Sequence, residues 1–224
     1  MKLTSITKRY DDNTVFDNFN LTIQDNKITC ILGKSGCGKT TLLNIIAHLT
    51  DYQGKTDVEN EKISYIFQNQ RLLNNLTVAG NLRYVLKNCN FSSNEIEEKI
   101  NDILKLVKLK ENKHMYPKQL SGGMAQRVSL ARAFVYPSKI LLMDEPFKGL
   151  DISLKKHIIK IFQDLFNNDK KTTIFVTHDI EEALLLADRI IVLGDGGIIL
   201  LDKELESRDD ALISNLRRNI YKIM

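Results

Sequence analysis

The chain has 224 residues, a length that fits one large domain or one domain with an inserted subdomain. Its hydrophobic fraction of 43% and charged fraction of 27% are ordinary for a globular protein, and a chain of this length needs no disulfide or metal staples. The formal net charge of +4 is spread along the sequence. It does not resemble the concentrated basic stripe of a nucleic-acid binder, so we expect no nucleic-acid partner.

Cysteine usage and hydropathy place the protein in a reducing compartment and outside the bilayer. Cys30, Cys37 and Cys89 are odd in number and are not spaced as metal ligands, which favours the cytosol. The first eight residues contain no apolar core of signal-peptide length. No apolar run approaches the roughly 20 residues that cross a bilayer. If the protein works at a membrane, we expect another chain to hold it there.

The first third of the chain is predicted to consist mainly of strands. Strand candidates, chosen for alternation, β-branched residues or short apolar runs, are residues 3–10, 14–23, 28–32 and 63–67. Residues 11–13, Asp-Asp-Asn, are predicted to form the turn between the first two strands. A glycine-rich loop follows residues 28–32, and residues 40–49 then show a helical pattern.

The middle of the chain is richer in helix. Ser92 and Glu95 have the spacing of a capping box and open a helix with apolar residues at helical period up to Val107. Residues 121–134 form a second helix candidate. After Tyr136, strands at 140–143, 173–176 and 189–193 alternate with helices at 152–166 and 180–187. The last segment, 203–224, is predicted to be one polar helix.

This alternation predicts an α/β fold: a mostly parallel sheet covered by helices, with an N-terminal antiparallel β part and an inserted α-helical subdomain. We expect a single domain over residues 1–224, with the α/β core at about 1–71 and 137–224 and the helical subdomain at about 72–136.

A phosphate-binding loop lies between the third strand and the first helix. The residues that match the pattern G-x-x-x-x-G-K-[ST] are Gly33, Lys34, Ser35, Gly36, Cys37, Gly38, Lys39 and Thr40. Glycines let backbone N–H groups turn inward around phosphate oxygens, and the helix that follows points its positive dipole end at the same anion. Lys39 can reach the β- and γ-phosphates, and the Thr40 hydroxyl can bind Mg²⁺. We include Thr41, the next residue, in this nucleotide site.

Cys37 lies inside this loop. Lys39, the N–H groups and the helix N-terminus make its surroundings electropositive, which favours a reactive thiolate. We therefore expect that a thiol reagent modifies Cys37 and that bound nucleotide protects it, although the alternative of an inert packed residue stays open.

Two acids end the apolar strand at residues 140–143. Asp144 and Glu145 are predicted to lie at the carboxyl edge of the sheet, where open α/β folds bind their ligands. Asp144 is expected to hold Mg²⁺, and Glu145 to polarise the attacking water. Without the phosphate loop, the same pair would be equally compatible with a solvated turn.

Further motifs identify the sequence as similar to the ABC ATPases. Residues 120–127, Leu-Ser-Gly-Gly-Met-Ala-Gln-Arg, resemble the signature sequence of that family. Gln68 resembles the Q-loop glutamine, and Gly149-Leu150-Asp151 the D-loop. His178 resembles the switch histidine, and Tyr10 the aromatic residue that stacks on adenine. Taken alone, Ser121 would be a helix cap, His178 an exposed histidine and Tyr10 a strand aromatic; the ordered set is far more specific than any member.

The resemblance implies a function and a set of roles. It implies an ATPase with a P-loop NTPase core in which two chains close head to tail around two ATP molecules and Mg²⁺. Ser121, Gly122 and Gly123 then meet the γ-phosphate held by the other chain, and Asp151 of the D-loop is assigned to the nucleotide-binding residues with them. Gln68 is assigned to the catalytic set with Glu145 and His178, and to the Mg²⁺ ligands with Thr40 and Asp144.

Residues 67–78 and 176–189 resemble importer ATPases for nitrate, sulfonates, taurine or pyrimidine precursors. We therefore expect the motor subunit of an importer of a small solute, peripheral to the cytoplasmic face of the cell membrane. The implied partners are integral-membrane permease chains, a second copy or a homologous ATPase, and a solute-binding protein that acts through the permease. An exporter ATPase and an ABC ATPase of DNA repair or translation remain alternatives.

Overall fold

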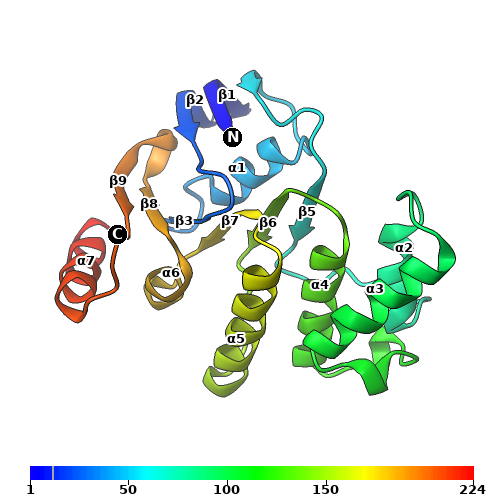
Figure 1. Cartoon of the computed structure of the whole chain (residues 1–224). Helices are drawn as coiled ribbons and strands as arrows, with labels where there is room; N and C mark the ends of the chain where they lie inside the picture. The colour runs from blue at the N-terminus through cyan, green and yellow to red at the C-terminus, as the bar shows by residue number, and fades with distance from the viewer. Residues whose placement is uncertain (12) are drawn as a thin grey trace. The chain divides into compact units, whose positions relative to one another are not determined.

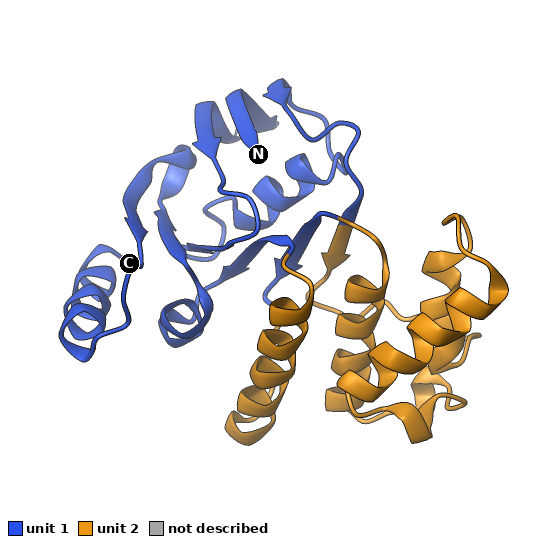
Figure 2. Cartoon of the chain, in the orientation of Figure 1, with its two compact units in different colours: residues 1–63, 139–145, 171–224 blue, residues 64–138, 146–170 orange. Residues whose placement is uncertain are grey.

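The chain forms two compact units, which Figure 2 shows in blue and orange. The computed structural model describes residues 1–11 and 13–224, so Asp12 of the predicted turn lies outside the described residues. Unit 1 comprises Met1–Ile63, Lys139–Glu145 and Lys171–Met224. Unit 2 comprises Ser64–Ser138 and Pro146–Lys170, so that the boundary falls within strand β5 (Ile63–Ile66).

Unit 1 begins with an antiparallel sheet. Strands β1 (Lys2–Tyr10) and β2 (Asn13–Thr22) pair as the alternation predicts, and their buried side chains include Leu3, Ile6 and Phe16. Strand β4 (Gln53–Thr56) joins the other edge of β1, where Leu3 pairs with Thr56. The polar sequence of β4 carries no strand pattern, so its conformation depends on the edge that β1 offers.

The main sheet of unit 1 runs in the order β6-β7-β3-β8-β9. Its parallel strands are β3 (Ile28–Leu32), β6 (Ile140–Asp144), β7 (Thr172–Thr177) and β8 (Arg189–Leu193). Nearly every residue of these strands is buried, as expected for a parallel sheet covered on its faces. Helix α1 (Lys39–Ile46) packs against β6 and β7, and helix α6 (Ile180–Leu186) against β3 and β7 (Figure 1). The predicted α/β class, with its parallel sheet and N-terminal antiparallel part, is confirmed.

The predicted single helix over residues 203–224 is wrong at its start. Strand β9 (Ile199–Glu204) pairs antiparallel with β8, so that Glu204 lies opposite Arg189, and helix α7 extends only over Asp210–Ile223. Asp209 caps this helix by accepting a hydrogen bond from the Leu212 N–H at 2.8 Å. The edge of β8 offers backbone partners to residues 199–204, and this pairing outweighs their weak local preference.

Unit 2 is helical over most of its length. Its helices are α2 (Val78–Leu86), α3 (Ser93–Leu106), α4 (Gly122–Val135) and α5 (Ile152–Asn168). The capping box predicted at Ser92 and Glu95 is present. Helix α4 packs against α2, α3 and α5. Helix α2 was not predicted; the Thr77 hydroxyl caps it, and the buried Asn81 side chain fixes the preceding loop by bonding both the N–H and the carbonyl of Leu73.

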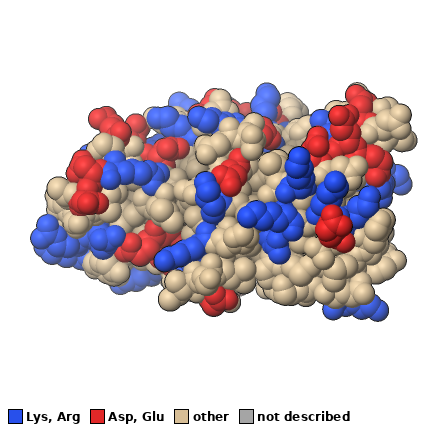
Figure 3. All heavy atoms as spheres, turned by 60° about the horizontal axis from the view of Figure 1, so that its bottom comes forward, with Lys and Arg blue, Asp and Glu red and all other residues tan. Residues whose placement is uncertain are grey.

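Among the described residues, no helix combines the length and apolar character that a membrane span requires. The same residues contain no group of three or more His, Cys, Asp or Glu side chains arranged to hold a metal ion. On the face that Figure 3 shows, basic and acidic side chains are interspersed.

Candidate functional site

The predicted phosphate loop connects β3 to α1 within unit 1. Gly36 and Gly38 have φ values of 88° and 102°, a region that favours glycine. A Cβ atom on Gly38 would lie 2.6 Å from Cγ1 of Val15, and one on Gly33 would lie 2.5 Å from the Leu193 carbonyl oxygen. The loop therefore depends on glycine for both its backbone conformation and its packing.

Lys39 is folded over this loop. Its side chain is buried, and its Nζ donates hydrogen bonds to the carbonyls of Gly33 and Lys34, each at 2.8 Å. The ammonium group is thus held at the loop by acceptors that a phosphate oxygen could replace. Lys34, Ser35 and Gly36, by contrast, are exposed at the tip of the loop.

The structure brings together two predicted Mg²⁺ ligands that are 104 residues apart. The Thr40 hydroxyl donates to Oδ1 of Asp144 at 3.1 Å. Asp144 ends β6 and is buried, whereas Thr40 opens α1 and is exposed. A hydroxyl and a carboxylate are oxygen donors, the class that Mg²⁺ prefers, so these two residues fit that ion. Thr41 lies in the first turn of the same helix, half-buried.

Glu145 and His178 form the second pair. Nδ1 of His178 lies 3.2 Å from Oε1 of Glu145, a contact in which the imidazole N–H donates to the carboxylate. The two residues follow the neighbouring strands β6 and β7, and the Glu145 N–H donates to the Val176 carbonyl at 3.0 Å. Glu145 has a φ of 44°, a left-handed conformation that costs a non-glycine residue of order 1–3 kcal/mol and is concentrated at active sites.

The predicted thiolate character of Cys37 is wrong. Its side chain is only 3% exposed, and this burial raises the pKa of the thiol above its ordinary value. The positive charge of Lys39 lowers the pKa, as expected, but by less than burial raises it. Because the thiolate is the form that reacts, the packed alternative fits this residue better.

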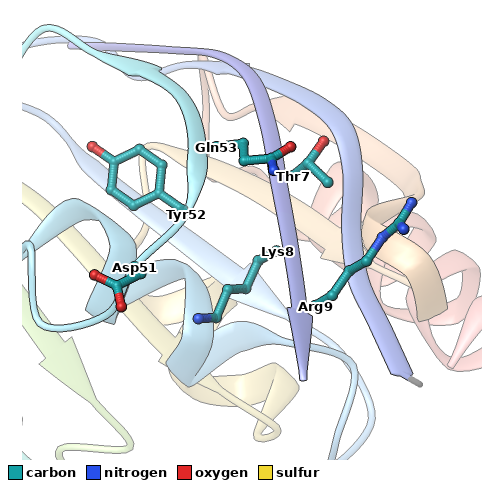
Figure 4. A pocket seen from close by; sticks show the side chains of 6 residues that line it. All are labelled: Thr7, Lys8, Arg9, Asp51, Tyr52 and Gln53. Atoms are coloured by element: carbon teal, nitrogen blue, oxygen red, sulfur yellow. The ribbon is translucent and has the colours of Figure 1, made fainter. Parts of the chain in front are cut away.

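Tyr10 ends β1 and is 45% exposed. The Lys8 ammonium lies over its ring, 4.5 Å from the centroid. The preceding residues of β1 line a cavity of about 380 Å³ together with Asp51, Tyr52 and Gln53. Figure 4 shows Lys8 and Asp51 on one side of the strand and Arg9 on the other.

The remaining predicted site residues belong to unit 2. Ser121 caps α4, where its hydroxyl accepts a hydrogen bond from the Met124 N–H at 3.3 Å. A Cβ atom on Gly122 would contact nothing within 4 Å, whereas Gly123 packs against Leu154. Asp151 caps α5 by accepting from the Leu154 N–H at 2.9 Å. Gln68 is exposed after β5. Within unit 2 these residues are accessible N-terminal helix caps and an exposed amide, with Gly123 buried beneath them.

Gln126 lies within the signature stretch, but the hydrogen bonds of its side chain were not predicted from the sequence. Its buried side chain donates to the Pro146 carbonyl at 2.6 Å and accepts from the amide of Gln70 at 3.1 Å. The signal was a polar residue at helical spacing from the apolar Leu130 and Phe134, on the buried face of α4.

Comparison with known proteins identifies the family. The family model described as ABC transporter matches residues 16–148. The chain therefore belongs to the ABC transporter family, as the ordered motifs predicted.

Two curated relatives and one solved structure illustrate which proteins this chain is similar to. The chain is 38% identical to the sulfate/thiosulfate import ATP-binding protein of Mesostigma viride, over 92% of this chain and 63% of the relative. It is 38% identical to the aliphatic sulfonates import ATP-binding protein of Bacillus subtilis, over 81% of this chain and 73% of the relative. A dimeric, post-hydrolysis structure of an ATP-binding cassette bound to ADP and Pi aligns with a TM-score of 0.77 and 31% identity, covering 92% of this chain and 99% of that one.

The similarity to sulfate and sulfonate import proteins agrees with the predicted resemblance to importers of the sulfonate type. Several of the curated relatives are longer, since the chain spans 56% to 63% of their length.

Proposed function

We propose that this chain is the ATP-binding and ATP-hydrolysing motor subunit of an ABC membrane transporter that imports a small solute. The observation that carries the proposal is the paired arrangement at the sheet edge of unit 1. Thr40 of the phosphate loop bonds Asp144, and the next residue, Glu145, contacts His178. These pairs support one site for the predicted phosphate, metal and water-activating groups, which nucleotide hydrolysis requires.

Each group has a chemical role. Loop N–H groups and Lys39 bind the β- and γ-phosphates, and Lys39 exchanges its carbonyl contacts for phosphate oxygens. Thr40, Asp144 and Gln68 would hold Mg²⁺, which would neutralise charge on the phosphates. Glu145 orients and polarises the attacking water, and His178 donates to the γ-phosphate or to that water. Tyr10 stacks on adenine with a face that is accessible to solvent.

The second half of each site comes from another chain. Ser121, Gly122 and Gly123 present a helix N-terminus that suits an anion, and Asp151 completes the seam. ATP closes the head-to-tail dimer, and hydrolysis reopens it. The dimeric form of the similar ATP-binding cassette supports this arrangement.

The partners follow from the proposed task. The chain works with integral-membrane permease chains and with a second copy or a homologous ATPase, and a solute-binding protein acts through the permease. It is held at the cytoplasmic face of the membrane. The core is formed by about residues 1–71 and 137–224, and the helical subdomain at about 72–136 faces the permease. The import names of the curated relatives favour this direction of transport over export.

The test is Glu145→Gln, which keeps the side-chain size and removes the basic carboxylate. Turnover of MgATP is expected to fall about 10²–10⁴-fold, the usual loss for a general base, while ATP affinity stays near wild type and an ATP-bound dimer accumulates. Steady-state hydrolysis, titration calorimetry and sedimentation measure the three quantities. Glu181→Gln, an exposed glutamate of α6, is the control. A Glu145→Gln protein with more than half of wild-type turnover contradicts the assignment.

A further inference from the structure

A buried threonine–glutamate pair lies beneath His178. The Thr177 hydroxyl donates to Oε2 of Glu182 at 2.7 Å. Thr177 is 2% exposed and Glu182 is 4% exposed. A carboxylate is seldom buried to this extent without partners, because desolvation penalises the charge. The roles assigned above to Glu145 and His178 do not require Glu182, so its burial needs a separate explanation.

The same hydroxyl is also an acceptor. The Asp179 N–H donates to Oγ1 of Thr177 at 3.1 Å, and the Asp179 carboxylate in turn accepts from the Glu182 N–H at 3.3 Å. These bonds close a ring through Thr177, Asp179 and Glu182. His178 is the one residue enclosed between Thr177 and Asp179, so the ring holds its backbone on both sides.

The position of the His178 imidazole depends on this backbone. Its side chain is 56% exposed and contacts Glu145, 33 residues away along the chain. Because the imidazole is exposed, packing does little to orient it. Its direction therefore depends mainly on the main chain, which sets the Cα–Cβ bond. The ring of hydrogen bonds supplies that constraint.

We propose that Glu182 is a positioning residue for His178: through the Thr177 hydroxyl and the Asp179 cap, it orients the histidine toward Glu145 and the γ-phosphate. This inference rests on the proposed ATPase function and extends it to a residue that does not touch the nucleotide. The carboxylate suits the task because an ionised acceptor forms the shorter and stronger bond to a hydroxyl.

The chain contains a matched control one residue away. Glu181 is also on α6, but its side chain is exposed and pairs with Arg217 at 2.7 Å and 2.8 Å. Glu181→Ala removes a carboxylate and an ion pair from the same helix and leaves the ring of hydrogen bonds intact. We expect it to keep wild-type turnover.

The experiment measures kcat and KM for MgATP with the purified full chain. Glu182→Ala is expected to lower kcat about 10- to 100-fold, since a 1 Å misplacement of a reacting group costs about 10²-fold, and to leave KM within about twofold. Glu182→Gln, whose amide oxygen still accepts from Thr177, is expected to recover most of the loss. Thr177→Val removes the hydroxyl at nearly constant shape and provides the same test if Glu182→Ala does not fold.

The His178→Ala background separates positioning from a purely structural role. If Glu182 acts through His178, then adding Glu182→Ala to His178→Ala lowers kcat no further, although the melting temperature can still fall. Multiplication of the two effects overturns the proposal. So does a kcat within twofold of wild type for both Glu182→Ala and Thr177→Val.

A readout without turnover keeps this inference distinct from the proposed function. Without nucleotide, the NMR resonances of the His178 imidazole, assigned by comparison with His178→Ala, are expected to shift in Glu182→Ala. They are expected to stay unchanged in Glu181→Ala. Absence of MgATP hydrolysis in the wild type, together with this shift, contradicts the ATPase function and leaves the positioning intact. Unchanged resonances in Glu182→Ala overturn the positioning.

Discussion

The two features that we propose to bind phosphate differ in how far their residues are buried and packed. In unit 1, Lys39 is 6% exposed and bonded to two loop carbonyls, and Thr40 is bonded to Asp144. In unit 2, Ser121 and Gly122 are exposed at the start of α4, and a Cβ atom on Gly122 would meet nothing within 4 Å. Two side chains of the phosphate loop are thus already hydrogen-bonded within unit 1, whereas the start of α4 is exposed to solvent.

This difference predicts different consequences of mutation. Ligand binding at the loop exchanges existing hydrogen bonds for new ones, so changes there affect both folding and affinity. At the start of α4, Ser121 caps the helix but Gly122 has free space around it, so we expect changes there to affect mainly what approaches from outside. Mutations of the two features therefore distinguish packing within a unit from contact with a ligand or a partner chain.

Among the changes that test this comparison, Ser121→Arg is expected to lower turnover most. The cation would fill the space proposed for the γ-phosphate of the other chain, and loss of preorganised donors at a developing charge costs about 10²–10³-fold. ATP binding by the single chain should persist. Hydrolysis rate and sedimentation with MgATP measure the outcome.

Ser92→Arg is its control, because Ser92 caps α3 with nearly the same backbone angles as Ser121. Equal losses of turnover in the two variants would show that Ser121 acts only as a helix cap. A rate per chain that does not depend on concentration would contradict the two-chain site.

Lys39→Ala is expected to weaken nucleotide affinity roughly 10- to 100-fold, because hydrogen bonds to a charged group contribute about 1.5–3 kcal/mol. Titration calorimetry with Mg²⁺ and a nonhydrolysable ATP analogue measures it. Lys27→Ala, an exposed lysine before β3, is the control. Equal affinity in Lys39→Ala and wild type would remove Lys39 from the site.

Two glycine variants compare the stability of the phosphate loop with that of the exposed start of α4. Gly38→Ala places a side chain at a φ of 102° and against Val15, so the free energy of unfolding is expected to fall by about 1–3 kcal/mol. Gly122→Ala is expected to change it by less than about 0.5 kcal/mol, as for an open surface position. Denaturant titration measures the free energy of unfolding of both variants. Similar losses of that free energy would mean that the start of α4 is also tightly packed.

Thiol modification should show the smallest effect. Because burial raises the pKa of Cys37, its thiolate fraction at a given pH is below that of a free thiol and grows only as the pH rises further. We expect N-ethylmaleimide to modify the half-buried Cys89 first, without loss of activity, and Cys37 slowly. Peptide mass against time, at two pH values, measures this order. Rapid modification of Cys37 that MgATP blocks would restore the thiolate prediction.

The local features of this protein follow from short stretches of its sequence. The phosphate loop, the apolar strands and the caps at Ser92 and Ser121 follow from spacing and residue type over a few positions, because glycine conformation, burial pattern and capping are local properties. The motif order sufficed for the family, and the motifs nominated Asp144, Glu145 and His178 before any geometry was known.

Which of these groups come into contact depends instead on the packing of distant parts of the chain. Thr40 bonds Asp144 across 104 residues, and His178 contacts Glu145 across 33, since parallel strands bring distant chain segments to one sheet edge. Strands β4 and β9 form because neighbouring edges offer backbone partners that their own residues do not specify. Burial of Cys37 and Glu182 likewise depends on what packs around them, and it changes the chemistry of both.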